Sequence, residues 1–411
     1  MKRRSTPARR RTIPYRRIAF AAPAILAGAF HASPPTQALQ ASADDALAIT
    51  VTGRTREVIM SNKEASHFAT DTHARDQRSY SGLYTAMHES LNDYVIMLDG
   101  VTLEPANAVS VDVLPWSMTR NYEAGAREEI AILDRAPVLT VRIHAGDTKP
   151  AQWTLTPIVD HRWIWETPFA QFEDEMIDGA FCIRRTGWAP PPNVPGWLAV
   201  KTSAPAAWTA TGVRRSATHP RDAARNAMAK TNPYEPGMFA GAWPAGAEYV
   251  DVVFALGFSA EDAAALAARS LADRDAKLEA RRARIRETIA TNALAIEDPR
   301  LAKAYDWARA SMDVLVMNVR GPGIYAGFHW FPNYWGRDTF ICVPGALLVT
   351  GQHDEARAIL RSFLQFQLLD RGSPRMGRLP NIVNPGELQY AGVDGTWWYV
   401  RAAYKYCKAR R

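Results

Sequence analysis

Two patterns of hydrophobic residues divide the chain. Between about residues 46 and 258, short runs rich in Val, Ile, Thr and aromatic residues are separated by Pro, Gly and Asp, as at 48–51, 94–98, 138–143, 152–159 and 249–256. Such runs are typical of the strands of a β-sandwich. From residue 259 onward, apolar residues recur mainly at the three- and four-residue spacing of helices. The order predicts a β-sandwich followed by a helical region.

The helical region has two clear start signals. Ser259 and Asp262 have the spacing of a capping box, which predicts one long helix over 263–288. Its many charged residues leave a narrow apolar stripe, as expected of a mostly solvated helix that links two domains. Asp298-Pro299 starts the next helix. We expect its core-facing stripe to be Leu301, Tyr305, Ala308, Met312, Leu315 and Val319.

Three further helices are expected near 339–349, 354–368 and from 394 onward. In the sandwich region, the segment HRWIWE at 161–166 carries two indoles at a spacing of two, Trp163 and Trp165. This spacing places both rings on one face of a strand. We favour a packed sheet face there, with a sugar-stacking platform as the alternative.

The segment 323–340, GIYAGFHWFPNYWGRDTF, follows neither pattern. Its aromatic residues surround the adjacent pair Arg337-Asp338, and Gly and Pro interrupt any helix through it. Aromatic rings next to a guanidinium and a carboxylate suit a sugar, because pyranose C–H faces stack on rings and hydroxyls bind charged groups. An aromatic core loop around a buried ion pair is the alternative. The residues alone leave both open.

This segment and three later ones resemble successive motifs of the amylo-α-1,6-glucosidases, the glucosidase part of bacterial-type glycogen debranching enzymes. The later motifs are PGALLVTGQ at 344–352, GRLPN at 377–381 and YAGVDGTWW at 390–398. The resemblance implies an α+β multidomain protein, with an N-terminal β-sandwich followed by an (α/α)6 barrel of six helical hairpins. About two hairpins would be present, so we expect a C-terminally truncated barrel. It also implies an α-glucan substrate, with α-1,6-linked glucose, and hydrolysis with inversion.

The resemblance implies a set of sugar-binding residues. Arg337 and Asp338 would hold glucose hydroxyls, as a guanidinium fork and a carboxylate can. Asp394 could equally be only a helix cap. We also considered Asp338 as the general acid, but a neighbouring guanidinium favours the charged carboxylate and opposes a raised pKa. The full set of candidates is Trp330, Trp335, Arg337, Asp338, Asn381, Asp394 and Trp397.

The two carboxylates of an inverting glycosidase are not found in these motifs. In the family, the acid lies in a Thr-Trp-Met-Asp motif and the base Glu in a later one, and this sequence contains neither. Whether the chain is an enzyme therefore stays open. One hypothesis is a glycoside hydrolase of debranching type. The other is a non-catalytic α-glucan-binding remnant or a poorly folded fragment.

Charge and cysteine content limit the kinds of function and site that the chain can have. The net charge is +7, but eight positive charges lie within the first 17 residues, which leaves −1 on the rest of the chain. A near-neutral body argues against nucleic-acid binding. Cys182, Cys342 and Cys407 have no metal-ligand or disulfide spacing, and we expect each to be a small buried hydrophobe. We expect no metal and no cofactor, and the sequence does not indicate an oligomeric state.

The first 43 residues read as an export signal. A basic start is followed by 13 apolar residues at 18–30, too few to span a bilayer of roughly 30 Å, and small residues at 41–43 offer a cleavage site. We expect a periplasmic or secreted protein, with a cytoplasmic one as the alternative. The expected divisions are the leader 1–43, the β-sandwich 44–258, the linker helix 259–297 and the glucosidase domain 298–411.

Overall fold

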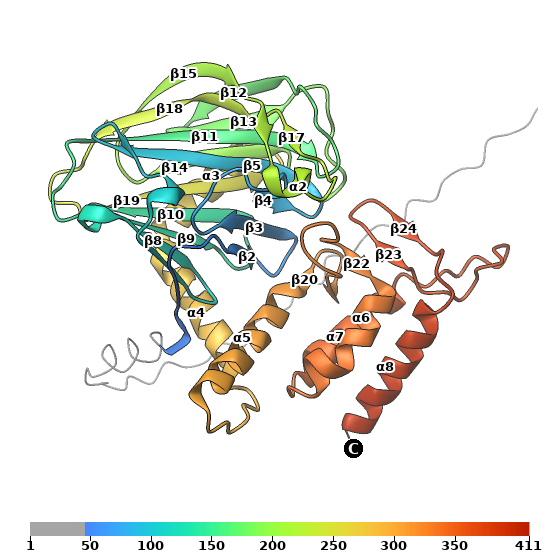
Figure 1. Cartoon of the computed structure of the whole chain (residues 1–411). Coiled ribbons are helices and arrows are strands. Elements are labelled where there is room, and N and C mark those ends of the chain that lie inside the picture. The colour runs from blue at the N-terminus through green and yellow to red at the C-terminus, as the bar shows by residue number, and fades with distance from the viewer. Residues whose placement is uncertain (1–45, 411) are drawn as a thin grey trace, which may run out of the picture. The chain divides into compact units, whose positions relative to one another are not determined.

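The computed structural model describes residues 46–410, so the leader 1–43 lies outside the described residues. Within this range the chain forms antiparallel strands first and helices afterwards (Figure 1), which confirms the mixed α and β composition. None of the described helices is long and apolar enough to cross a membrane.

Two large antiparallel sheets form what we call the two-sheet unit. In spatial order, the nine-stranded sheet consists of β1 (Ile49–Val51), β7 (Ser110–Val113), β8 (Met118–Asn121), β9 (Arg127–Ile132), β10 (Val138–His144), β19 (Tyr249–Gly257), β14 (Trp197–Thr202), β13 (Ala180–Arg185) and β12 (Phe172–Ile177). The eight-stranded sheet consists of β15 (Ala207–Arg214), β18 (Tyr234–Ala242), β11 (Gln152–Trp163), β5 (His88–Leu98), β4 (Gly82–Thr85), β3 (Ser66–Asp71) and β2 (Glu57–Ser61), with β6 (Val101–Thr102) paired to β5.

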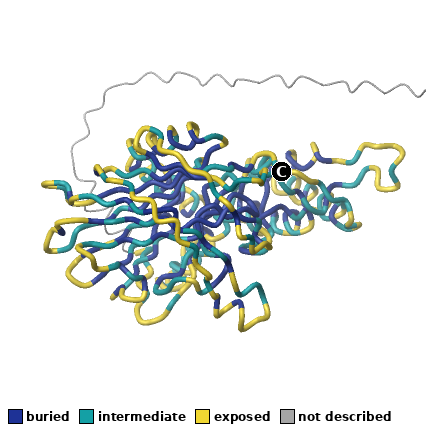
Figure 2. Tube along the Cα trace, turned by 90° about the horizontal axis from the view of Figure 1, so that it is seen from above, coloured by how far each residue is buried: buried dark blue, intermediate teal, exposed yellow. Residues whose placement is uncertain are grey.

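The two sheets pack face to face on a shared core. Val141 of β10 and Phe254 of β19 meet Leu91 of β5 and Leu155 of β11 in one cluster of buried side chains. Figure 2 shows how the buried positions concentrate along these strands. Short elements complete the unit: η1 (Pro105–Asn107), η2 (Glu123–Gly125), β16 (Ala217–Thr218), α2 (Pro220–Ala223) and β17 (Lys230–Thr231).

The five predicted strand segments overlap β1, β5, β10, β11 and β19, but the prediction for Trp163 and Trp165 is wrong. Strand β11 ends at Trp163, and the chain turns there because the Ile164 N–H donates to the Met87 carbonyl and the Glu166 N–H donates to the Trp163 carbonyl. Trp165 therefore lies beyond the strand, and the two indoles do not share a strand face.

The predicted linker helix is two helices, α3 (Ala260–Ala272) and α4 (Arg274–Ala290), separated at Asp273. The Ser259 hydroxyl accepts the Asp262 N–H, as the capping signal predicts. The prediction of a mostly solvated helix is wrong for α3. Its small residues, such as Ala263 and Ala267, pack on the outer face of the nine-stranded sheet, where small side chains allow close approach.

Helix α5 (Pro299–Leu315) begins as predicted, with the Asp298 carboxylate accepting the Arg300 N–H. The predicted core-facing stripe is only partly confirmed: Leu315 and Val319 pack against the C-terminal core, but Leu301 is 62% exposed while Ala310, outside the stripe, is buried. The helix also ends before Val319. The chain leaves the helix there because β20 (Val316–Asn318) pairs with β21 (Pro322–Ile324).

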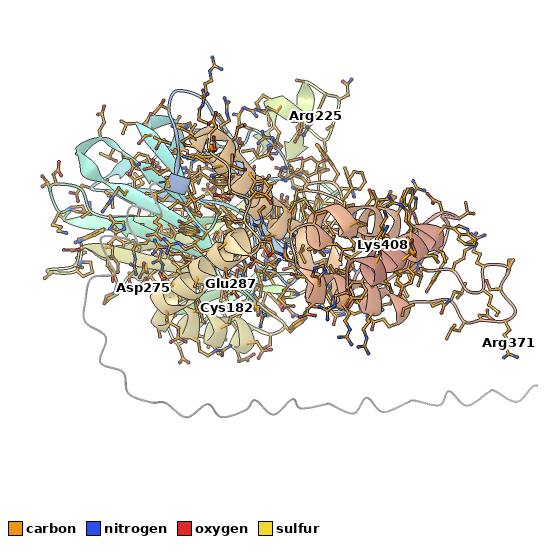
Figure 3. The ribbon with its side chains drawn as sticks, turned by 90° about the horizontal axis from the view of Figure 1, so that it is seen from below. Cys182, Arg225, Asp275, Glu287, Arg371 and Lys408 are labelled. Carbon is orange, nitrogen blue, oxygen red and sulfur yellow. The ribbon has the colours of Figure 1, made fainter. Side chains whose placement is uncertain are left out.

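The C-terminal helices are α6 (Gly336–Val343), continued by the π-helical turn η3 (Pro344–Leu348), α7 (His353–Leu364) and α8 (Gly395–Ala409). They share a core that includes Phe340 and Phe363. Three short strands lie beside them: β22 (Tyr334–Trp335), β23 (Ile382–Val383) and β24 (Leu388–Gln389). The loop after α7 projects outward and carries Arg371, whereas Lys408 lies on α8 (Figure 3).

The prediction that each cysteine is buried is confirmed for one of the three. Cys182 is buried and Cys342 is half-buried, but Cys407 is exposed on α8. The prediction is wrong for Cys407 because its helix turns that side away from the core formed with α6 and α7.

Candidate functional site

The aromatic segment 323–340 divides its rings between the core and the surface. Tyr325, Tyr334 and Phe340 are buried in the core of the C-terminal helices. The Tyr334 hydroxyl donates to the Met317 carbonyl at 2.7 Å and accepts the Val319 N–H. These rings therefore fix the segment, as the core-loop interpretation expects.

Arg337 forms an ion pair with a different residue from the one next to it in sequence. Its Nε and Nη2 donate to the two carboxylate oxygens of Asp394, at 2.7 and 2.9 Å. This bidentate pair joins the first turn of α6 to the start of α8. About half of each side chain is exposed, so the alternative of a buried ion pair does not hold. The hydrogen bond from Arg337 lowers the pKa of Asp394 below its usual value and raises that of Arg337.

Asp338 occupies the first turn of α6 and is half-buried. Among the described residues, no donor is hydrogen-bonded to its carboxylate. The free N–H groups of a helix start stabilise a negative charge in this place. Burial raises the pKa of Cys342, one turn further along α6, and the charge of Asp338 contributes in the same direction. Asp338 is thus a hydrogen-bond acceptor without a partner among the described residues.

A glycine sets where α6 begins. The Gly336 N–H donates to the Asn381 carbonyl at 2.9 Å. A Cβ atom at position 336 would lie 2.5 Å from the Pro380 carbonyl oxygen, so any other residue would push the two segments apart. This close approach brings the GRLPN motif against the start of α6.

The structure places Asn381 and Asp394 in different roles. The Asn381 side-chain oxygen is buried against Gly392 and has no hydrogen-bond partner among the described residues. Asp394 precedes α8, but its side chain makes no capping bond to the helix and instead binds Arg337. The capping alternative for Asp394 is therefore not what its carboxylate does.

Trp335 lies directly before α6 and is half-buried. Its indole N–H donates to the Asn333 side chain at 3.0 Å, and its ring meets Phe331 edge to face at 5.6 Å between centroids. Trp397, in the first turn of α8, is 73% exposed. Arg337, Asp338, Trp335 and Trp397 therefore all belong to the starting ends of two adjacent helices.

Trp330 has a different environment. Its ring packs edge to face on Tyr80 of the two-sheet unit at 5.8 Å, and the Arg225 guanidinium lies over its face at 4.6 Å. A ring face covered by a guanidinium is not open to a sugar. In this arrangement Trp330 attaches the aromatic segment to the two-sheet unit.

The residues of the two-sheet unit that contact the aromatic segment were not predicted from the sequence. His329 is hydrogen-bonded to Glu57 of β2, and the Phe328 ring lies 4.7 Å from His67 of β3. Burial alone would raise the pKa of Glu57, but the hydrogen bond with His329 and the charge of Arg78 lower it overall. No local pattern around these residues marks the contact, because it joins positions more than 250 residues apart in sequence.

Residues 307–411 match the family model described as amylo-alpha-1,6-glucosidase. This match confirms the resemblance seen in the motifs. A glycogen debranching enzyme of Saccharomyces cerevisiae is 34% identical over 90 residues, which are 21% of this chain and 5% of the yeast protein. The amylo-alpha-1,6-glucosidase match includes every candidate sugar-binding residue.

Two solved structures share the fold of a larger part of the chain. A bacterial glucoamylase complexed with acarbose gives a TM-score of 0.52 at 12% identity, over 88% of this chain and 59% of that one. An inverting mannosidase of family GH92 from Bacteroides thetaiotaomicron gives 0.52 at 12% identity, over 85% of this chain and 51% of that one. The chain thus spans little more than half the length of these structures and a small part of the yeast protein. Its C-terminal part is similar to the glycogen debranching family, and a larger part of the chain shares the fold of these two glycoside hydrolases.

Proposed function

We propose that this chain binds α-glucans at the adjacent starts of α6 and α8, and that these helices form part of an (α/α)6 glucosidase domain of the debranching type. The observation that carries the proposal is the division of roles around Arg337. Its guanidinium is held by Asp394, and within residues 46–410 no donor is hydrogen-bonded to the Asp338 carboxylate on the same helix turn.

The chemistry of these groups fits a glucose unit. A carboxylate accepts hydrogen bonds from two adjacent hydroxyls, which suits Asp338. Arg337 uses Nε and Nη2 for Asp394 and retains further N–H donors for a sugar oxygen. We propose that the half-buried Trp335 ring stacks on an apolar sugar face. Asp394 acts as a positioning residue that fixes the direction of Arg337.

We propose binding rather than hydrolysis as the function of the residues present. An inverting glycosidase needs two carboxylates roughly 6.5–9.5 Å apart, one of them protonated as the general acid. Asp338 lies in the first turn of α6, and its carboxylate oxygens suit an acceptor of sugar hydroxyl groups. The alternative is that the chain hydrolyses α-1,6-linked glucose by the inverting mechanism.

Calorimetry with maltotriose and isomaltose tests the proposal. Asp338→Ala should weaken binding at least tenfold, because a hydrogen bond to a charged group contributes about 1.5–3 kcal/mol. Asp354→Ala is the matched control, since Asp354 occupies the first turn of α7 in the same way. Equal affinities of wild type and Asp338→Ala would refute the proposal. If the wild-type chain releases glucose and Asp338→Asn abolishes this release, the function of the site is hydrolysis rather than binding alone.

A further inference from the structure

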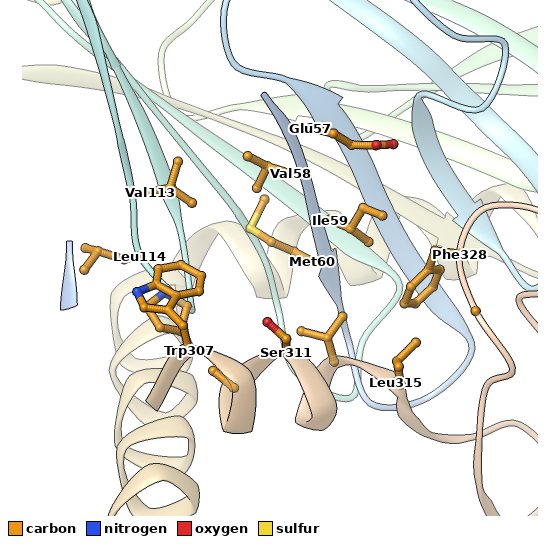
Figure 4. A pocket seen from close by; sticks show the side chains of 14 residues that line it. Glu57, Val58, Ile59, Met60, Val113, Leu114, Trp307, Ser311, Leu315 and Phe328 are labelled. Atoms are coloured by element: carbon orange, nitrogen blue, oxygen red, sulfur yellow. The ribbon is translucent and has the colours of Figure 1, made fainter. Parts of the chain in front are cut away.

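Strand β2 and helix α5 face each other across a cavity of about 470 Å³ (Figure 4). On the helix side the cavity is lined at positions i, i+3, i+4, i+7 and i+8, which form one face of α5. These residues are Trp307, Ala310, Ser311, Val314 and Leu315. On the strand side it is lined by residues 57–60, and Leu114 and Phe328 close its two sides. The side chains of the walls are therefore mostly apolar, with Glu57 and Ser311 as the polar ones.

The strand and the helix are joined at one end of this cavity. The Ser61 hydroxyl donates to the Val314 carbonyl at 2.7 Å, and the Lys63 ammonium binds the Asp313 carboxylate at 2.8 Å. Towards Glu57 and Trp307 the two elements separate and leave the cavity between them. The cavity therefore extends from this junction along residues 57–60 of β2.

The backbone of β2 has an open edge on the cavity side. It is the last strand of its sheet and pairs only with β3. The Asn62 N–H donates to the Ser66 carbonyl and the Thr72 N–H donates to the Arg56 carbonyl. Because bonded pairs alternate in an antiparallel ladder, the N–H and C=O groups of Glu57 and Ile59 point away from β3. None of the described residues is hydrogen-bonded to them.

We propose that this cavity binds an extended segment of another polypeptide, which pairs with β2 as an added strand and inserts its apolar side chains towards α5. Open backbone groups beside an apolar groove are what such strand addition requires. The Glu57 carboxylate, the one charged side chain in the lining, already binds His329 and Arg78. The site therefore offers no free charge for an ionic head group, which favours an uncharged stretch of peptide over a lipid-like ligand.

The probe is the capped peptide acetyl-Lys-Val-Thr-Val-Thr-Val-Lys-amide with a fluorescein label, titrated with the full chain and followed by anisotropy. In an added strand, alternate residues turn their N–H groups towards β2. Two N-methylated forms distinguish the register, one methylated on the three Val residues and one on the two Thr residues. We expect saturable binding, with at least a tenfold loss for one form and little change for the other.

Ile59→Pro tests the same contact from the protein side. Proline removes the N–H that points to the cavity and leaves the bonds between β2 and β3 in place. We expect at least tenfold weaker peptide binding with a melting temperature close to that of wild type, whereas Ile59→Val should bind as wild type does. Ser311→Phe, which fills the cavity from a solvent-facing position, should also weaken binding.

Three outcomes would overturn the proposal. The first is the absence of saturable binding of the probe by the wild-type chain. The second is equal binding of both N-methylated forms and the unmodified peptide, which would indicate an unspecific apolar cavity. The third is equal affinity of Ile59→Pro and wild type. Binding of a fluorescent apolar dye to the cavity, together with no binding of the peptide, would likewise indicate an unspecific apolar cavity.

Discussion

His67 of β3 provides a test of how the aromatic segment is held on the two-sheet unit. Its imidazole is 1% exposed, stacks on Tyr84 at 5.1 Å between ring centroids and meets Phe328 at 4.7 Å. Burial lowers its pKa from 6.5 to about 3, and the nearby His329 acts in the same direction. The ring is therefore neutral in the folded protein, with its Nδ1 lacking a partner among the described residues.

The sign of the effect follows from this lowered pKa. The unfolded chain binds a proton at His67 as the pH falls through about 6.5, and the folded chain does not. The contribution of the neutral ring to stability is thus fully present above pH 6.5 and is lost as the pH falls towards about 3. Between pH 7.5 and pH 5.5 this linkage amounts to about 1.4 kcal/mol for one histidine.

The assay is urea unfolding of the wild type and of His67→Phe at the two pH values. Phenylalanine keeps an aromatic ring between Tyr84 and Phe328 but cannot titrate. The free energy of unfolding of the wild type should fall by about 1.4 kcal/mol more than that of the variant between pH 7.5 and 5.5. Other buried groups, such as His161 and Glu89, also titrate with shifted pKa values, but they are common to both proteins and cancel. The same pH dependence in both proteins would refute the reasoning.

Three further changes test the site and the fold. Arg337→Lys should weaken maltotriose binding about tenfold by calorimetry, because an ammonium cannot form the two-pronged contact that fixes this side chain. Asp134→Ala should destabilise the protein by about 3–5 kcal/mol in urea unfolding, since it leaves the buried Arg281 guanidinium without its carboxylate. Gly336→Ala should destabilise it by about 1–3 kcal/mol, because the added Cβ meets the Pro380 carbonyl oxygen, and an unchanged midpoint would contradict this.

The features predicted correctly are those that depend on neighbours in the sequence. Ser259 and Asp298 each cap a helix through a side-chain bond to a residue two or three positions further on, so the signal lies in a few adjacent residues. The break at Asp273 could not be predicted in the same way. It is set by packing, because α3 lies on the sheet through its alanines while α4 is held by buried arginines such as Arg281.

The face that a helix buries could not be predicted from the sequence either. On α5 a stripe through Leu301 and Met312 and another through Trp307 and Val314 both have helical spacing. The structure turns the second towards the two-sheet unit. Periodicity gives the spacing of apolar residues, but only the tertiary contact decides which stripe is covered.

In the candidate site, too, the tertiary contacts decide which residues pair. Adjacent residues on a helix point about 100° apart, so Arg337 and Asp338 cannot form the pair that their sequence suggests, and Arg337 finds its partner 57 residues away.

The motifs meet because Trp335 of β22 pairs with Ile382 of β23, and because the Leu379 N–H donates to the Thr396 hydroxyl of α8. Each motif thus supplies one part of the contact between the starts of two helices. A substitution in one motif should therefore disturb the placement of the others, and a resemblance across several motifs in the same order reports on a single site rather than on several unrelated loops.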